Sequence, residues 1–231
     1  MRRLQLIEFH EQPWFPSSLR DEITDALQFG LNLLKAYEPI APRLKSVLDS
    51  TRTRSIVDLC SGAGGPWLGL SRKLQRDAQP FHILLTDKYP NPGASQNVRG
   101  ISENYIAFYP EPIDAMNVPC ELKGFRTMFS SFHHFSPQEA RAILQHAVDA
   151  GQSIGLFEIT RRSPLTIGFM LPWALLLFVF TPWIRPFSWS RLLGTYVVTI
   201  RPCVFVFYGI VYCPRPSRPS YFLSICRSLV E

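Results

Sequence analysis

Apolar residues recur at helical spacing early in the chain and then give way to short continuous apolar runs. Within residues 17–35 they return every third or fourth position, which predicts a helix because one face is then apolar. These positions are Ile23, Leu27, Leu31 and Leu34. A second helix is expected over residues 39–48.

Five short runs rich in β-branched and aromatic residues predict strands. They cover residues 55–60, 81–87, 103–110, 124–135 and 153–160. Helices are expected over residues 67–75 and after Ser136, which forms a capping-box pattern with Glu139. Alternating strands and helices favour an α/β fold with a parallel sheet and right-handed crossovers. Ligands of such folds bind beyond the carboxyl ends of the strands.

The charge is basic but dispersed. The formal net charge is +6, and basic residues occur in pairs such as Arg72 and Lys73, without a run of five. We therefore expect no nucleic-acid partner. The five cysteines form no Cys-x-x-Cys pair, and the first residues lack the apolar region of a signal peptide. A cytoplasmic, reducing location is expected.

The stretch VDLCSGAGGPW places Gly62, Gly64 and Gly65 directly after a predicted strand that ends in Asp58. Glycines let the backbone turn tightly and approach a ligand, and the following helix directs its N–H groups at that ligand. The pattern therefore predicts a cofactor cradle. A dinucleotide site would need a third glycine where Trp67 stands, so an NAD site is disfavoured.

The segment DLCSGAGG resembles motif I of the class I S-adenosylmethionine-dependent methyltransferases of the small-molecule type. Four later segments resemble further motifs of that family, in the same order. They are LLTDKYPN, EPIDAMNVP, TMFSSFHHFSPQEA and GLFEIT. The resemblance covers about residues 20–160. It implies a Rossmann-like, doubly wound, mostly parallel sheet and S-adenosyl-L-methionine as the cofactor.

The resemblance also implies roles for individual residues. Asp87, after the second strand, would accept hydrogen bonds from the ribose hydroxyls, and Asp114 with Ala115 would meet the adenine. Asp58 would favour the cationic sulfonium. The full expected cofactor-binding set is Asp58, Cys60, Ser61, Gly62, Gly64, Asp87, Lys88, Asp114, Ala115 and Ser130. A local capping role for Asp58 and a plain turn role for Asp87 are the alternatives.

His133 and His134 end the fourth predicted strand and are candidate general bases. Adjacent side chains of a strand point to opposite faces, so we expect at most one histidine to face the acceptor. The alternative is that both only line the cofactor site. Glu158, at the end of the fifth strand, is expected either to touch substrate or to pair with an arginine. No third ligand accompanies the histidines, so we expect no metal site.

The chain becomes strongly apolar after Arg162. Residues 163–184 hold 22 positions without a charge; as a helix they would span about 33 Å, against roughly 30 Å of bilayer core. Pro172 and Pro182 interrupt that helix. Three interpretations stay open: a membrane-associated element within residues 163–213, an apolar lid over a lipophilic substrate, or a dimer interface or core.

Three segments are therefore expected. They are an N-terminal helical cap (1–50), a cofactor-binding α/β core (51–162) and an apolar C-terminal helical region that completes the sheet (163–231). The expected activity is methyl transfer to a small lipophilic acceptor at oxygen, nitrogen or carbon. The rival hypothesis is a non-catalytic membrane-associated protein that retains the fold. The sequence leaves the acceptor and the oligomeric state open.

Overall fold

The computed structural model describes residues 12–75, 80–101, 105–159, 175 and 178–197. The chain forms two compact units. One comprises residues 27–158, and the other combines residues 1–26 with residues 159–231. The organisation into segments 1–50, 51–162 and 163–231 stays a prediction.

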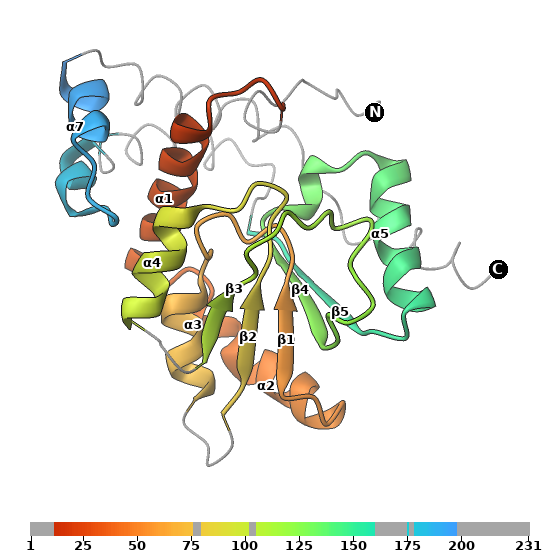
Figure 1. The fold of residues 1–231 in the computed structure, drawn as a ribbon. Coiled ribbons are helices and arrows are strands. Elements are labelled where there is room, and N and C mark those ends of the chain that lie inside the picture. The colour runs from red at the N-terminus through yellow and green to blue at the C-terminus, as the bar shows by residue number, and fades with distance from the viewer. Residues whose placement is uncertain (1–11, 76–79, 102–104, 160–174, 176–177, 198–231) are drawn as a thin grey trace, which may run out of the picture. The chain divides into compact units, whose positions relative to one another are not determined.

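The larger unit is a Rossmann-like α/β domain built on a five-stranded parallel sheet (Figure 1). Its strands are β1 (Ser55–Asp58), β2 (His82–Leu85), β3 (Ile106–Phe108), β4 (Phe125–Phe129) and β5 (Ile154–Phe157). Their spatial order is β3-β2-β1-β4-β5, so the winding direction reverses between β1 and β4. Asp58 lies in register with Leu85 of β2 and Thr127 of β4. The carboxyl ends of the central strands are therefore level at one edge, where such folds bind ligands.

Helices cover both faces of this doubly wound sheet. The helical elements of the larger unit that follow α1 (Ser17–Leu33) are η2 (Glu38–Ile40), α2 (Ala41–Ser50), α3 (Trp67–Leu74), α4 (Pro92–Ile101), η3 (Phe132–His134) and α5 (Pro137–Asp149). Leu44 of α2, Leu70 of α3 and Val98 of α4 share one buried cluster with the sheet. On the opposite side of β4, the buried Arg126 reaches α5, with its Nη1 atom 2.9 Å from His146 Nδ1.

Several sequence predictions are confirmed. The α/β class and the five parallel strands agree with the structure. The helix expected over residues 17–35 is α1, which runs from the smaller unit into the larger one. The capping box of α5 is formed: Glu139 N donates to Ser136 Oγ at 3.3 Å, and Ser136 N donates to Glu139 Oε2 at 2.8 Å.

One prediction needs correction, and one helix was missed. The strand expected over residues 124–135 ends at Phe129, because Ser130 adopts a φ of 45° and turns the chain into the 3-10 helix η3. His133 and His134 therefore do not project to opposite faces of a strand; their ring centroids lie 4.2 Å apart. Helix α4 was not predicted, because the segment PGASQNVRGI has few apolar residues and reads as a loop.

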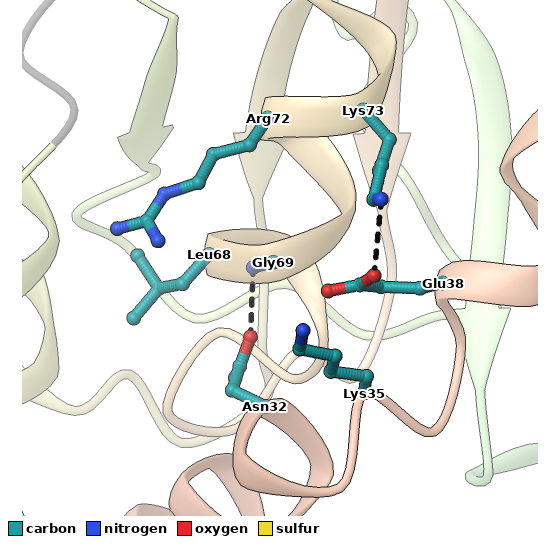
Figure 2. A pocket seen from close by; sticks show the side chains of 7 residues that line it. All are labelled: Asn32, Lys35, Glu38, Leu68, Gly69, Arg72 and Lys73. Atoms are coloured by element: carbon teal, nitrogen blue, oxygen red, sulfur yellow. Dashed lines mark hydrogen bonds and ion pairs between the residues drawn. The ribbon is translucent and has the colours of Figure 1, made fainter.

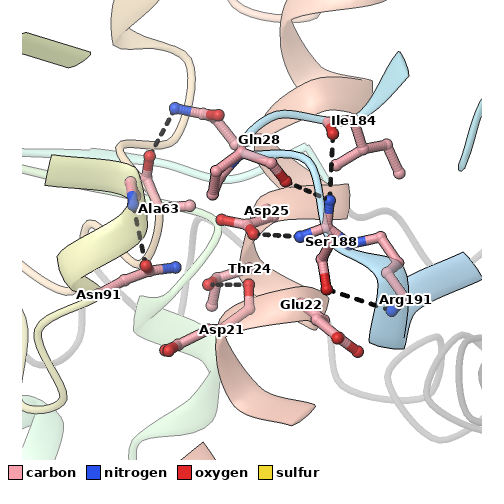
Figure 3. A network of polar contacts seen from close by, with 12 residues as sticks. Asp21, Glu22, Thr24, Asp25, Gln28, Ala63, Asn91, Ile184, Ser188 and Arg191 are labelled. Atoms are coloured by element: carbon pink, nitrogen blue, oxygen red, sulfur yellow. Dashed lines mark hydrogen bonds and ion pairs between the residues drawn. The ribbon is translucent and has the colours of Figure 1, made fainter. Parts of the chain in front are cut away.

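The smaller unit contains the first turns of α1, η4 (Thr181–Trp183) and α7 (Trp189–Tyr196). A buried ion pair joins Arg191 of α7 to Asp25 of α1 (Figure 3). Arg191 Nη1 also donates to the backbone oxygens of Ile184 and Pro186, at 3.1 and 2.8 Å. Ser190 adds a hydrogen bond to Glu22 Oε1 at 2.8 Å. These bonds join α7 to the first turns of α1 within the smaller unit.

Among the residues that the structure describes, no helix has both the length and the apolar character needed to cross a membrane. Most of the uncharged run at 163–184, and residues 198–213 of the expected membrane-associated segment, lie outside the described residues. The expectation that the C-terminal region completes the sheet falls on the same undescribed part of the chain.

Candidate functional site

A left-handed loop follows β1 at the level edge of the sheet. Cys60, Gly62, Gly64 and Gly65 have φ angles of 57°, 55°, 106° and 48°. A Cβ atom on Gly64 would also stand 3.1 Å from the Gln28 side chain and 3.3 Å from that of Leu85. The glycine requirement at this position is therefore both conformational and steric. Cys60 also has a positive φ although it carries a side chain, which disfavours this conformation by about 1–2 kcal/mol.

The Asp58 side chain is buried next to this loop, does not face solvent, and accepts a hydrogen bond from Ser61 of the loop. Asp58 is 1% exposed. Thr127 Oγ1 donates to one carboxylate oxygen at 2.6 Å, and Ser61 Oγ donates to the other at 2.7 Å. Burial raises the pKa of Asp58 to about 7, against the lowering effect of these two hydrogen bonds. These contacts agree with the alternative given above, in which Asp58 makes only local hydrogen bonds within the protein.

Asp87 ties the glycine loop to the end of β2. Gly62 N donates to its Oδ2 atom at 2.7 Å, and Tyr89 N donates to Oδ1 at 2.8 Å. Its backbone oxygen accepts from Ile113 N at 2.9 Å, which brings the segment before Asp114 to the same place. The side chain is half-buried. Each carboxylate oxygen has two lone pairs, so Asp87 can still accept hydrogen bonds from ligand hydroxyls.

Asp114 lies beside this loop in a half-exposed position. Lys88 Nζ is 3.2 Å from its Oδ2 atom, and Met116 N donates to Oδ1 at 2.9 Å. Lys88 is thus directed at a carboxylate of the protein in this structure. Ala115 is buried, at 4% exposure, so its methyl group contributes to packing. The structure therefore brings Asp87, Asp114 and the glycine loop together, while Asp58 lies beneath them.

Ser130 belongs to the adjacent pair of strand ends, β4 and β5. Tyr37 Oη lies 2.6 Å from Ser130 Oγ and donates to the Phe157 backbone oxygen at 3.2 Å. Burial raises the pKa of Tyr37 above its ordinary range, and the nearby charges of Glu158 and Asp58 act in the same direction. Tyr37 is therefore a neutral hydrogen-bonding group at this edge. Nothing in the sequence connects it to Ser130, because the two lie 93 positions apart.

His133 and Glu158 form a polar pair at the same edge. His133 Nδ1 lies 2.7 Å from Glu158 Oε2, and Phe132 N donates to Glu158 Oε1 at 3.0 Å. The side chains are 6% and 15% exposed. A carboxylate on Nδ1 favours the tautomer that carries its proton there, which leaves Nε2 as the basic nitrogen. The sequence singled out Glu158 but expected substrate or an arginine, whereas its partner is a candidate base.

Trp67 occupies the place of a third dinucleotide-site glycine and is completely buried. Its ring packs edge-on against Phe129 of β4, with centroids 5.4 Å apart. The start of α3 is therefore separated from the sheet by an indole, where a dinucleotide fingerprint needs close helix–strand approach. This packing argues against an NAD site.

The residues at this edge fit a cofactor that carries hydroxyls and a positive charge. Two incompletely buried carboxylates, Asp87 and Asp114, flank a loop whose conformation favours glycine. Carboxylates accept charge-assisted hydrogen bonds from hydroxyls and favour nearby cations. Within the described ranges, no group of three or more His, Cys, Asp or Glu side chains is placed to hold a metal ion.

Comparison with known proteins assigns no family to the chain. No protein-family model matches it, and no curated protein matches its sequence significantly. The fold is therefore established from the sheet topology alone, and the motif resemblance provides a hypothesis about function.

Proposed function

We propose that the chain is a methyltransferase of the class I type that binds S-adenosyl-L-methionine and methylates a small, lipophilic acceptor. The observation that carries the proposal is the hydrogen bond from Gly62 N to Asp87 Oδ2, because it joins the glycine loop to the acid after β2. In the proposal Asp87 holds the ribose hydroxyls, while Asp114 and Ala115 border the adenine. When bound, the cofactor supplies an electrophilic methyl group.

The protein's own part in the chemistry is to position the acceptor and, where the acceptor carries a proton, to remove it. His133 is the proposed base, and Glu158 is its positioning residue. The 2.7 Å contact of Glu158 with His133 Nδ1 restrains the ring, and in the proposal Nε2 is the nitrogen that removes the proton. His134, whose ring lies beside that of His133 at an angle of 31°, forms a wall of the same site in the proposal.

Asp87→Ala should weaken S-adenosylhomocysteine binding by roughly 1.5–3 kcal/mol, since charge-assisted hydrogen bonds to the ribose are lost. Calorimetric titration of the full chain measures this loss. Asp149→Ala, which removes an exposed carboxylate from α5, is the control and should bind as the wild type does. Asp87→Asn keeps the side-chain shape but can accept only one of the two backbone hydrogen bonds that Asp87 accepts, so thermal unfolding of each variant shows whether the fold is retained.

Two results would count against this placement. Unchanged affinity in Asp87→Ala would show that the ribose is not held there. A flat titration of folded wild-type protein would remove the cofactor itself and favour the rival function, a non-catalytic membrane-associated protein that retains the fold. A third result, binding without any turnover, would also support this rival.

His133→Ala should lower methyl transfer by roughly 100-fold or more, the usual contribution of a positioned base. The measurement follows label from the methyl group of S-adenosylmethionine into an organic extract of membranes, which supplies lipophilic acceptors. His134→Ala is the matched control and should retain most of the activity. Equal losses in the two variants would contradict the assignment of the base to His133.

We also propose that α7 docks on a membrane surface, because its polar side chains are buried and its apolar side chains are exposed. Its polar residues Arg191 and Thr195 are buried, at 4% and 3% exposure. On the other side Trp189, Leu193 and Val197 follow at intervals of four residues and are 73%, 58% and 72% exposed. Apolar helix faces with tryptophan are typical of elements that lie in the headgroup region of a bilayer.

Leu193→Ser combined with Val197→Ser should reduce binding to phosphatidylcholine vesicles by about tenfold or more, because two apolar side chains no longer leave water. Vesicle sedimentation measures the effect. Val47→Ser with Val148→Ser, two exposed positions of the larger unit, is the control. Equal binding by both double variants would exclude α7 as the docking face. If the Leu193 and Val197 variant lost the ability to form dimers and kept its vesicle binding, the face would be a subunit interface.

A further inference from the structure

A groove in the larger unit, separate from the candidate site, lies beside α3. The groove has a volume of about 420 Å³, which is in the range of small-molecule sites. Its walls come from the end of α1, the turn after it, η2 and α3 (Figure 2). The lining residues are Asn32, Lys35, Glu38, Leu68, Gly69, Arg72 and Lys73. None of these belongs to the set at the carboxyl ends of the strands.

The groove has more positive than negative charge. Three of its lining residues are basic and one is acidic, so their sum is +2. Lys73 Nζ is 3.3 Å from Glu38 Oε2, so these two charges offset each other. Across the part of the chain that the structure describes, the side chains of Lys35 and Arg72 have no hydrogen bond or ion pair. Two positive charges thus face the groove without compensation.

The backbone conformation of Lys35 also indicates a functional role for the groove. Lys35 has a φ of 52° in the turn that ends α1, and Ala36 N donates to the Leu31 oxygen at 3.0 Å. This left-handed position after a helix is usually occupied by glycine, because a side chain there is disfavoured by about 1–2 kcal/mol. Strain of this kind concentrates at functional sites. Here it accompanies a lysine that lines the groove.

The floor of the groove is polar but already bonded. Gly69 N donates to Asn32 Oδ1 at 2.8 Å, and Asn32 Nδ2 donates to the backbone oxygens of Gln28 and Gly65 at 2.8 and 2.9 Å. A Cβ atom on Gly69 would lie only 3.2 Å from Asn32 Oδ1, so glycine keeps this floor close-packed. Recognition in the groove is therefore left to the basic side chains around it, with Leu68 as an apolar wall.

We propose that this groove binds the phosphate group of a phosphomonoester. Such a group carries about two negative charges near neutral pH, which matches the two uncompensated cations. A guanidinium can bind two phosphate oxygens at once, whereas an ammonium acts as a compact point charge. Arg72 supplies the first and Lys35 the second. The proposal does not depend on the methyltransferase assignment, because no residue is shared with that site.

The test is titration of the full chain with glycerol 3-phosphate, with glycerol as the uncharged probe. Wild-type protein should bind the phosphomonoester and not glycerol. Lys35→Gln with Arg72→Gln should weaken that binding by roughly tenfold or more. Arg43→Gln with Lys123→Gln removes the same charge from exposed positions outside the groove and should leave the affinity unchanged.

A second arm separates a soluble ligand from a lipid headgroup. The same proteins are mixed with phosphatidylcholine vesicles, with and without phosphatidic acid. Binding of glycerol 3-phosphate identifies a soluble phosphomonoester. Stronger binding to the vesicles that contain phosphatidic acid than to phosphatidylcholine vesicles, lost in the groove variant and without binding of glycerol 3-phosphate, identifies a lipid headgroup. Equal weakening in the groove and control variants would attribute binding to net charge, and no binding of either probe would overturn the site. Thermal unfolding checks that every variant is folded.

Discussion

Gly124→Ala should destabilise the larger unit by roughly 3–5 kcal/mol, the largest effect that we expect from a single methyl group. Gly124 directly precedes β4 and has a φ of 156°, where side chains are strongly disfavoured. An added Cβ atom would stand 2.6 Å from the Ser55 backbone oxygen and 2.9 Å from its carbonyl carbon. Because Ser55 opens the central strand β1, that backbone cannot move aside without disturbing the sheet.

Urea unfolding followed by circular dichroism measures this loss, and Gly151→Ala is the matched control. Gly151 also has a positive φ, of 63°, but an added Cβ atom there would meet nothing within 4 Å. This variant should therefore lose only about 1 kcal/mol, from backbone conformation alone. A similar loss in the two variants would show that the contact with Ser55 relaxes, and that conformation accounts for both effects.

The sequence predicted the sheet because its strands are short apolar runs separated by clear helix signals. The capping box of α5 illustrates this, since its two residues, Ser136 and Glu139, belong to the same short segment and can be recognised together. Helix α4 was missed because its segment has few apolar residues. The end of β4 was placed too late because aromatic residues recur after Phe129, at Phe132 and Phe135, and only the φ of Ser130 shows where the chain turns.

The candidate site was predictable where it depends on strand ends. Asp58 and Asp87 each follow an apolar run, and a parallel sheet necessarily brings such positions to one edge. Their partners were not predictable, because these contacts join distant segments. Thr127 reaches Asp58 across 69 positions, and Tyr37 reaches Ser130 across 93. His133 pairs with Glu158 where the chain forms η3, whereas the sequence analysis predicted that these residues continue a strand.

Asp58 also gives the protein a pH dependence whose sign can be worked out. Burial raises its pKa to about 7 in the folded protein, whereas an aspartate in the unfolded chain titrates near pH 4. Between these values the folded state holds a proton that the unfolded state has released. The stability that Asp58 contributes therefore decreases as the pH rises from about 4 to about 7. The stabilisation from its bound proton is fully present only below the pKa of the unfolded chain.

Asp58→Asn should remove that slope, because an amide keeps the shape of the side chain but does not titrate in this range; its oxygen can accept from one of the Thr127 and Ser61 hydroxyls, and its nitrogen can only donate to the other. A shift of about three pH units corresponds to on the order of 4 kcal/mol. Relative to the wild type, the variant should therefore gain stability as the pH rises from about 4 to about 7, by up to that amount. Urea unfolding of both proteins at several pH values measures the difference, which also cancels the titration of every other group. A difference that stays constant with pH would show that the Asp58 carboxylate is already ionised in the fold, with Thr127 and Ser61 outweighing its burial.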